Sequence, residues 1–224
     1  MRTLTRKKRP IYANERHPKN IYERICLYLT DRINELKTRA DSKIEGNRNL
    51  WWFNDSLDFI DFLASHRADC KSDRKQFIEF VEEWIYLNND NITIKANGKN
   101  LKLSQVLYSI ARCGSLHNFS TSPFFYDEKL GYKNTIFVTN RTEKSQNEYH
   151  KEIVNVNLQD GNPPHQGIVI IAEDFVEDIE NCVDKIIAAL KSRSKKYTQL
   201  KKNLKNSFNV TCPPYSWYGY KQRN

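Results

Sequence analysis

The chain has 224 residues, of which 39% are hydrophobic and 12% aromatic, and this is enough apolar material for one domain with a buried core. Its mean hydropathy is −0.75, and the sequence has no apolar run of the length that a membrane-spanning helix needs. The basic N-terminus is not followed by an apolar stretch, so we expect a cytoplasmic protein with neither a secretory signal nor a membrane partner.

The formal net charge of +9 is concentrated at the two ends of the chain. Residues 1–9 hold five basic side chains and no acidic one, and residues 191–224 hold nine basic and no acidic ones. The body between them, residues 10–190, has 22 basic and 27 acidic residues. Basic ends on an acidic body favour a polyanionic partner, RNA above all. The alternative is that the charged ends only keep the protein in solution.

Helices are expected first along the chain. Apolar residues recur at three- and four-residue steps from Ile21 to Leu36, which predicts an amphipathic helix over about 19–40. The stretch from Asn54 to Ser56 is expected to cap a second helix, and Asp73 a third.

The period then changes from helix to strand. Alternating residues on both sides of Asn97 and Gly98 predict a hairpin, because this dipeptide favours a tight turn. Ser104 is expected to cap a fourth helix, which would continue as far as Ala111.

Three β-rich runs between residues 119 and 171 predict a small sheet, followed by a long helix that begins near Ala172. We therefore expect a mainly α fold, a bundle of four to five helices with a small β-rich insert before the last long helix. The expected divisions are a basic arm (1–18), a helical domain (19–194) and a basic, aromatic tail (195–224). The lysines of that tail are candidate nucleic-acid ligands: Lys195, Lys196, Lys201, Lys202 and Lys205.

The candidate catalytic residues are Arg112 and His117, at the end of the fourth helical run. A guanidinium can hold a phosphate through a fixed fork of donors, and an imidazole can move a proton near neutral pH. Together they could cleave RNA by attack of the 2′-OH on the adjacent phosphorus, without a metal or other cofactor. One copy supplies a single His, so a two-fold dimer that pairs two motifs would complete the acid–base pair.

Helical geometry leaves a second interpretation open. Five positions along a straight helix rotate about 140°, so a bend or helix end at Gly114 would be needed to bring the two side chains together. Without it, His117 would be a hydrogen-bonded core residue and Arg112 a surface residue.

The phrase Ile110-Ala111-Arg112-Cys113-Gly114-Ser115-Leu116-His117-Asn118 resembles the Arg-x4–6-His motif of the HEPN superfamily, in particular its bacterial Arg-Cys-Gly-Leu-x-His form. The resemblance implies a helical bundle, a homodimer and a metal-independent endoribonuclease, often a toxin or an anti-phage defence effector. In that family the Arg and His of the motif are catalytic. A polar residue often follows the Arg, where this chain has Cys113, so polar support would come from Ser115 or Asn118.

Other functions stay open. The protein could be a non-catalytic nucleic-acid-binding or regulatory module, or it could act with an antitoxin or inhibitor partner. We expect no metal site, because the carboxylates of Asp55, Asp58 and Asp61 are explained more simply as a solvated helix face. The five cysteines form no CxxC pair, and Cys26, Cys113 and Cys182 are expected to be small core residues.

Overall fold

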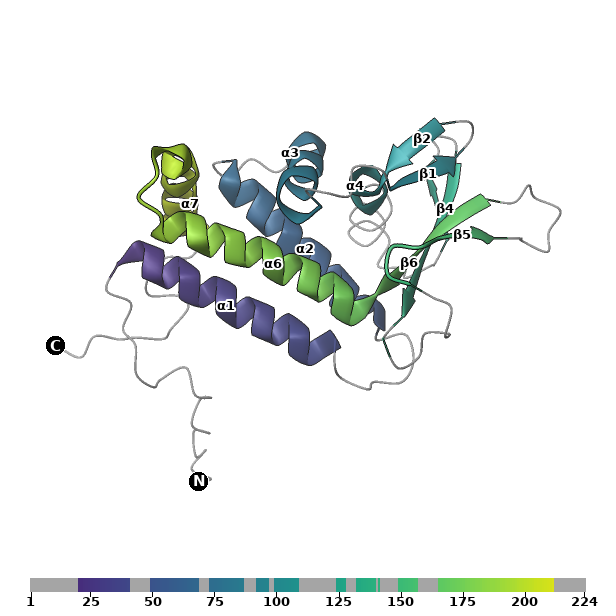
Figure 1. The fold of residues 1–224 in the computed structure, drawn as a ribbon, viewed down its shortest axis with the longest axis horizontal. Helices are drawn as coiled ribbons and strands as arrows, with labels where there is room; N and C mark the ends of the chain where they lie inside the picture. Colours follow the sequence, from purple (N-terminus) through teal and green to yellow (C-terminus); the bar gives the residue numbers. More distant parts are fainter. Residues whose placement is uncertain are drawn as a thin grey trace, which may run out of the picture.

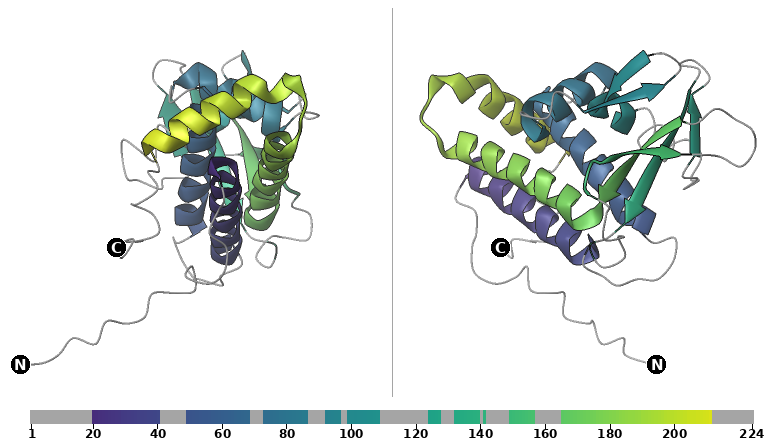
Figure 2. Two further views of the ribbon diagram at one scale, coloured as in Figure 1. Left: turned by 90° about the vertical axis from the view of Figure 1, so that its left-hand side faces the viewer. Right: turned by 45° about the vertical axis from the view of Figure 1, so that its right-hand side comes forward.

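The structure, a computed structural model, describes residues 20–40, 49–68, 73–86, 92–96, 99–108, 124–127, 132–139, 141, 149–156 and 165–211. The described chain is mainly helical, as predicted. Its long helices run side by side, with a sheet at one end of the molecule and helix α7 at the other (Figure 1). Figure 2 shows α7 lying across the end of the bundle.

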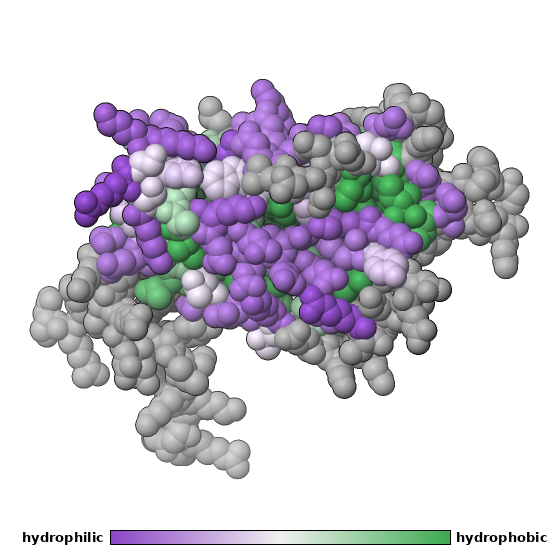
Figure 3. All heavy atoms as spheres, viewed as in Figure 1, coloured by the Kyte–Doolittle hydropathy of each residue, from purple (hydrophilic) through white to green (hydrophobic). Residues whose placement is uncertain are grey.

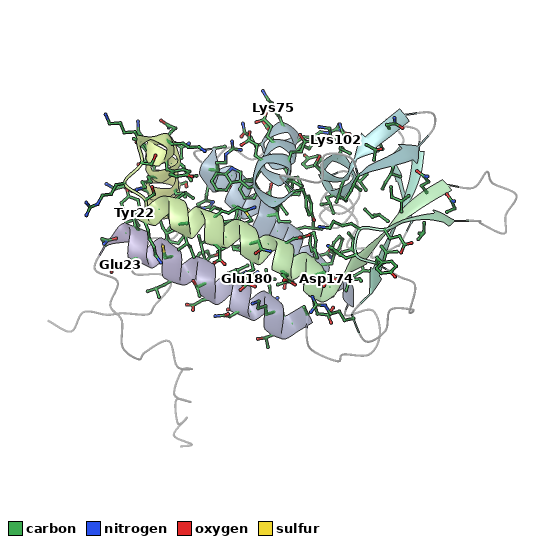
Figure 4. The ribbon with its side chains drawn as sticks, viewed as in Figure 1. Tyr22, Glu23, Lys75, Lys102, Asp174 and Glu180 are labelled. Atoms are coloured by element: carbon green, nitrogen blue, oxygen red, sulfur yellow. The ribbon has the colours of Figure 1, made fainter. Side chains whose placement is uncertain are left out.

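Helices α1 (Ile21–Ala40) and α6 (Ala172–Lys191) form one side of the bundle and begin and end close to the predicted positions. Their apolar stripes are buried at intervals of three and four residues, which is the spacing that puts side chains on one face of a helix. Lys37 of α1 pairs with Glu180 of α6 at 2.6 Å, at a place where the two helices face each other (Figure 4).

Helix α2 (Asn49–Arg67) begins five residues earlier than predicted. The expected cap, Asn54 to Ser56, is wrong because these residues lie inside the helix. Ser56 is buried, and its hydroxyl donates to the carbonyl of Trp52 at 2.8 Å, which is how a serine is accommodated in a helix interior. Trp52 and Phe53, which precede the expected cap, are buried against Phe175 of α6. Apolar packing has therefore extended the helix past a local capping signal.

Helix α3 (Arg74–Phe80) is capped by Asp73 as predicted, because the Asp73 carboxylate accepts from the backbone N–H of Gln76 at 2.8 Å. It continues into a π-helical segment, η1 (Val81–Ile85). Strands β1 (Thr93–Ala96) and β2 (Lys99–Lys102) then pair antiparallel with Ala96 opposite Lys99. This register leaves a two-residue connection at the predicted position, and residues 97 and 98 themselves lie outside the described residues.

Helix α4 (Leu103–Val106) follows β2 directly, and its predicted cap is wrong. Lys102 precedes the helix, and the backbone N–H of Lys102 donates to the side chain of Gln105 at 3.0 Å. Ser104 lies in the helix instead, buried, and its hydroxyl donates to Glu82 of η1 at 2.8 Å. A tertiary partner has taken the hydroxyl that would otherwise have capped the helix.

The predicted small sheet before α6 has four strands in the order β3-β4-β6-β5. These are β3 (Phe124–Asp127), β4 (Tyr132–Thr139), β5 (Ile153–Val156) and β6 (His165–Ile171). Two antiparallel pairs, β3 with β4 and β5 with β6, meet through a parallel pairing of β4 with β6. Strand β6 is central and buried from Ile168 to Ile171, which explains its continuous apolar run.

Helix α7 (Thr198–Thr211) belongs to the same core as the bundle. Leu204 and Phe208 are buried, and the ring of Phe208 meets that of Tyr28 edge-on at 5.3 Å. The buried residues of α7, the long helices, the hairpin β1–β2 and strand β6 form one contiguous cluster. The first part of the predicted tail is therefore packed onto the helical body.

Candidate functional site

The predicted catalytic motif lies outside the described residues, and so do its supporting positions. This applies to Arg112, Cys113, Ser115, His117 and Asn118. The described chain before the motif ends at Tyr108, four positions from Arg112. The Tyr108 ring packs edge-on against Phe77 of α3 at 5.5 Å, with the guanidinium of Arg74 above it at 6.0 Å.

The elements that lead into the motif are firmly attached to η1. Leu103, Val106 and Leu107 are buried in the core. The Glu82 carboxylate accepts from the Ser104 hydroxyl at 2.8 Å and pairs with the Lys102 ammonium at 3.3 Å. Lys102 lies on the outer side of this junction (Figure 4). The chain that leads into the motif is therefore held in place as far as Leu107.

The predicted nucleic-acid ligands all lie in the described part of the chain, in the turn after α6 and in α7. Residues 191–211 carry seven basic side chains and no acidic one. Strongly hydrophilic residues gather at this end of the molecule in Figure 3. Lys195, Lys196, Lys202 and Lys205 are exposed, and we call these four the basic face.

Lys201, the fifth predicted ligand, has a structural task. It is partly buried, and its ammonium donates to the backbone carbonyl of Ser192, just after α6. A positive charge there also stabilises the negative end of the α6 dipole. Lys201 therefore closes the turn that carries the basic face, and it is not counted as part of that face.

Packing against α2 fixes the orientation of the basic face. The Ser207 hydroxyl donates within α7 to the Asn203 carbonyl at 2.9 Å. The Asn203 side chain donates to the carbonyl of Arg67 at 2.6 Å, and Ser207 Oγ also lies 3.3 Å from the carbonyl of His66. These carbonyls belong to the last turn of α2, which has no intrahelical donors left for them. The α7 face that carries Asn203, Leu204 and Ser207 is thus turned inward, and Lys202 and Lys205, three residues apart, share the exposed face.

A second polar cluster, at the junction of the sheet and α6, was not predicted from the sequence. The carboxylate of Asp178 accepts from His150 Nε2 at 3.1 Å and from Lys151 Nζ at 2.7 Å. The Lys151 ammonium also lies 4.6 Å from the ring centre of Tyr86, at the end of η1. Because the partners are 27 and 28 positions apart in sequence, no spacing pattern could have revealed the cluster.

The hydrogen bonds of His150 fix its tautomer. Its Nδ1 accepts from the backbone N–H of Ile171 at 3.0 Å, so the ring proton sits on Nε2 and points at Asp178. Both ring nitrogens are engaged, and the side chain is only 10% exposed. His150 therefore fastens the sheet to α6, and it presents no lone pair to a reacting group.

The pKa values of this cluster follow from burial and charge. Burial alone would raise the pKa of Asp178, but the hydrogen bonds from His150 and Lys151 and the charge of Lys151 outweigh it and lower the pKa. Tyr86 shows the opposite balance, since burial, and then the nearby Asp178 carboxylate, raise its pKa well above the ordinary value. The cluster thus holds an ionised carboxylate beside a neutral phenol.

His66 is a packed core histidine near the end of α2. Its Nδ1 lies 2.7 Å from the carbonyl of Phe62, and its ring centre lies 3.7 Å from that of Phe62. Burial lowers the pKa of His66 despite this hydrogen bond.

Two cysteines lie among the described residues. Cys182 is buried, which raises its thiol pKa to about 12, and Cys26 is a partly buried free thiol.

On the acidic face of α2, Asp55 pairs with Arg39 of α1. Among the described residues, no three His, Cys, Asp or Glu side chains gather as metal ligands would. No described helix is both long and apolar enough to cross a bilayer.

Comparison of the chain with protein-family models, with curated proteins and with solved structures found no match. The features that bear on function are therefore the basic face, the elements that hold it, and the motif in the sequence.

Proposed function

We propose that this protein is an RNA-binding endoribonuclease of the HEPN type, which holds RNA on the basic face and cleaves it with Arg112 and His117. The observation that carries the proposal is the basic face, four exposed lysines within a segment, residues 195–205, that has no acidic residue and whose turn and helix pack onto the core. Phosphate contacts by such lysines supply most of the sequence-independent affinity for a nucleic acid. The mainly helical fold is compatible with a HEPN-like bundle.

In the proposed reaction, the 2′-oxygen forms a bond to the adjacent phosphorus as its proton leaves to an imidazole. The bond to the 5′-oxygen breaks, and that oxygen takes up a proton. The Arg112 guanidinium stabilises the charge that develops on the phosphoryl oxygens. Two copies of His117 across a homodimer would supply one base and one acid, each with a pKa near the working pH.

Non-catalytic RNA binding is the second candidate function, and the same basic face favours it. It differs from the first only in the role of Arg112 and His117. The proposal in either form concerns RNA as the partner, and an antitoxin or inhibitor would be an additional partner.

The binding part is tested by replacing three residues of the basic face, Lys195, Lys202 and Lys205, with glutamine. The control replaces Lys75, Lys102 and Lys185, which are exposed lysines of other elements. Each lost phosphate contact lowers the slope of log affinity against log salt by about 0.7 for a single strand. Fluorescence anisotropy should show weaker binding and a slope smaller by about 2 for the first triple variant alone. Equal effects of the two triple variants would contradict the proposal.

The cleavage part is tested with His117→Ala and Arg112→Ala, assayed on labelled RNA in the presence of a chelator. We expect both variants to lose cleavage while keeping the affinity and the circular dichroism spectrum of the wild-type protein. The control is His165→Ala, a histidine at the start of β6. RNA binding without cleavage by the wild-type protein would favour the non-catalytic function instead.

A further inference from the structure

The turn between α6 and α7 is held by several short-range hydrogen bonds. Ser192 Oγ accepts from the N–H of Ser194 at 3.1 Å, and Ser194 Oγ accepts from the N–H of Lys196 at 3.3 Å. The N–H of Tyr197 donates to the carbonyl of Ser194 at 3.2 Å, which closes the short 3₁₀ turn η3 (Lys195–Tyr197). With Lys201 fixed to Ser192, the backbone under Tyr197 is pre-organised.

The ring of Tyr197 differs from the tyrosine rings of the core. Tyr28 and Tyr108 each meet another aromatic ring at about 5.5 Å or less and pack against the core cluster. Tyr197 is partly exposed, lies outside that cluster and meets no other aromatic ring among the described residues. Its one ring contact in that part of the chain is with a cation, the Lys196 ammonium, 5.6 Å from the ring centre. Core packing therefore does not account for an aromatic side chain at this position.

We propose that Tyr197 is a stacking platform for an unpaired base, so that the RNA bound by the basic face is single-stranded there. Lys195 and Lys196, which precede Tyr197 in the turn, and Lys202 in the first part of α7 would contact the phosphates that flank the stacked nucleotide. This inference rests on the proposed function and adds the class of RNA to it.

The choice of a single strand follows from what a lone aromatic ring can contact. Within a duplex the faces of the bases are covered by their neighbours, and proteins recognise the duplex by its shape and backbone. A partly exposed ring gains a partner only when a base is unpaired, and stacking is then largely independent of which base it is. Lysines alone would bind a duplex equally well, so Tyr197 makes the distinction.

The test compares Tyr197→Leu with Tyr197→Phe, because leucine removes the flat ring and phenylalanine keeps it. Anisotropy titrations use a short labelled uridine oligonucleotide and a duplex RNA of the same length. We expect Tyr197→Leu to bind the single strand roughly 5- to 150-fold more weakly, the range that corresponds to one stacked base. Tyr197→Phe should bind it as the wild-type protein does, and the duplex affinity should change little. The control is Tyr149→Leu, an exposed tyrosine, 65% accessible, near β5.

The outcomes separate this inference from the function on which it rests. If the triple lysine variant loses RNA binding but Tyr197→Leu does not, the stacking platform is wrong and the basic face stands. If Tyr197→Leu weakens single-strand and duplex binding equally, the ring has no role in selecting a single strand. If the wild-type protein binds neither RNA, both proposals fail.

Discussion

Asp178 helps to join the sheet to α6, because it accepts hydrogen bonds from both His150 and Lys151 of the turn before β5. That turn has its own strain, since Lys151 adopts a φ of 63°, in the left-handed region. The backbone N–H of Lys151 compensates by donating to the carbonyl of Val169 in β6 at 2.7 Å. The side-chain and backbone contacts therefore hold one turn from two directions.

We expect Asp178→Asn to lower the free energy of unfolding by about 1.5–3 kcal/mol, the range for a hydrogen bond to a charged group. An amide offers one oxygen to two donors, and it leaves the Lys151 charge without its partner. Urea unfolding followed by circular dichroism measures the change. The control is Asp184→Asn, an exposed carboxylate on the same helix, for which we expect no more than about 0.5 kcal/mol.

The stability difference between the wild type and Asp178→Asn should depend on pH, with a defined sign. The pKa of Asp178 is lower in the folded protein than its ordinary value of 3.8, so its contribution is complete above that value. It disappears as the pH falls through the folded pKa, because protonation of the carboxylate weakens both hydrogen bonds. The stability difference between the wild type and Asp178→Asn should thus shrink on acidification below about pH 4. A difference that grows on acidification would contradict this assignment.

At the scale of elements, the end of α2 and the inner face of α7 form a reciprocal contact. The Asn203 amide donates to the Arg67 carbonyl, and Ser207 Oγ lies near the His66 carbonyl. The Phe208 ring meets the His66 ring edge-on, with 6.2 Å between the ring centres. The helix that carries the basic face is therefore also the cap of a core helix. A change that loosens α7 would expose unpaired carbonyls as well as apolar surface.

We expect Asn203→Ala to destabilise the protein by about 1 kcal/mol, as the loss of a helix cap does. Asn206→Ala, on the exposed face of the same helix, makes the matched control and should be nearly neutral. Thermal unfolding by circular dichroism distinguishes the two. Because alanine favours a helix more than asparagine does, helix propensity cannot cause a loss in either variant. Equal changes in stability would mean that the contact with Arg67 contributes nothing measurable.

The elements that the sequence predicted well are those whose own periodicity is strong. The stripe from Ile25 to Leu36 and the run from Phe175 to Leu190 located α1 and α6, and the Asn97-Gly98 dipeptide located the hairpin. The caps at Asn54 and Ser104 failed because a capping side chain competes with tertiary partners, here the Trp52 carbonyl and Glu82. The parallel pairing of β4 with β6 depends on a long-range register that no local pattern encodes.

In the candidate site too, some features were predictable from the sequence and others depend on the fold. Residues 191–205 contain no acidic residue, and this composition, which is read from the sequence alone, predicted a basic surface. That Lys201 turns back to Ser192, and that Tyr197 stands beside Lys196 outside the core, depends on the fold of the turn. The catalytic roles of Arg112 and His117 stay a prediction from the motif.

In the molecule as a whole, the basic face and the sheet lie at opposite ends of the long helices, and one core connects them. The basic face lies at one end and the sheet at the other, separated by the length of α6, about 30 Å for its 20 residues. Helix α6 begins at the sheet end with carboxylates, among them Asp174 (Figure 4). Arg141 pairs there with Asp174 and Glu177. An approaching polyanion would therefore be attracted to the α7 end and repelled by the surplus carboxylates near the start of α6.

Because one buried cluster runs from the sheet through the helices to α7, we expect the molecule to unfold as a single cooperative unit. Phe208→Ala should then cost about 3–5 kcal/mol and shift the whole transition. Far-ultraviolet circular dichroism and tryptophan fluorescence should give coincident urea curves for the wild type and the variant. If α7 were an independent tail, Phe208→Ala would leave the main transition in place. Since the cluster includes Leu204 and Phe208, truncation at residue 194 would remove part of the core together with the lysines. The contribution of the basic face to RNA binding can therefore be measured only by substitutions at its exposed positions.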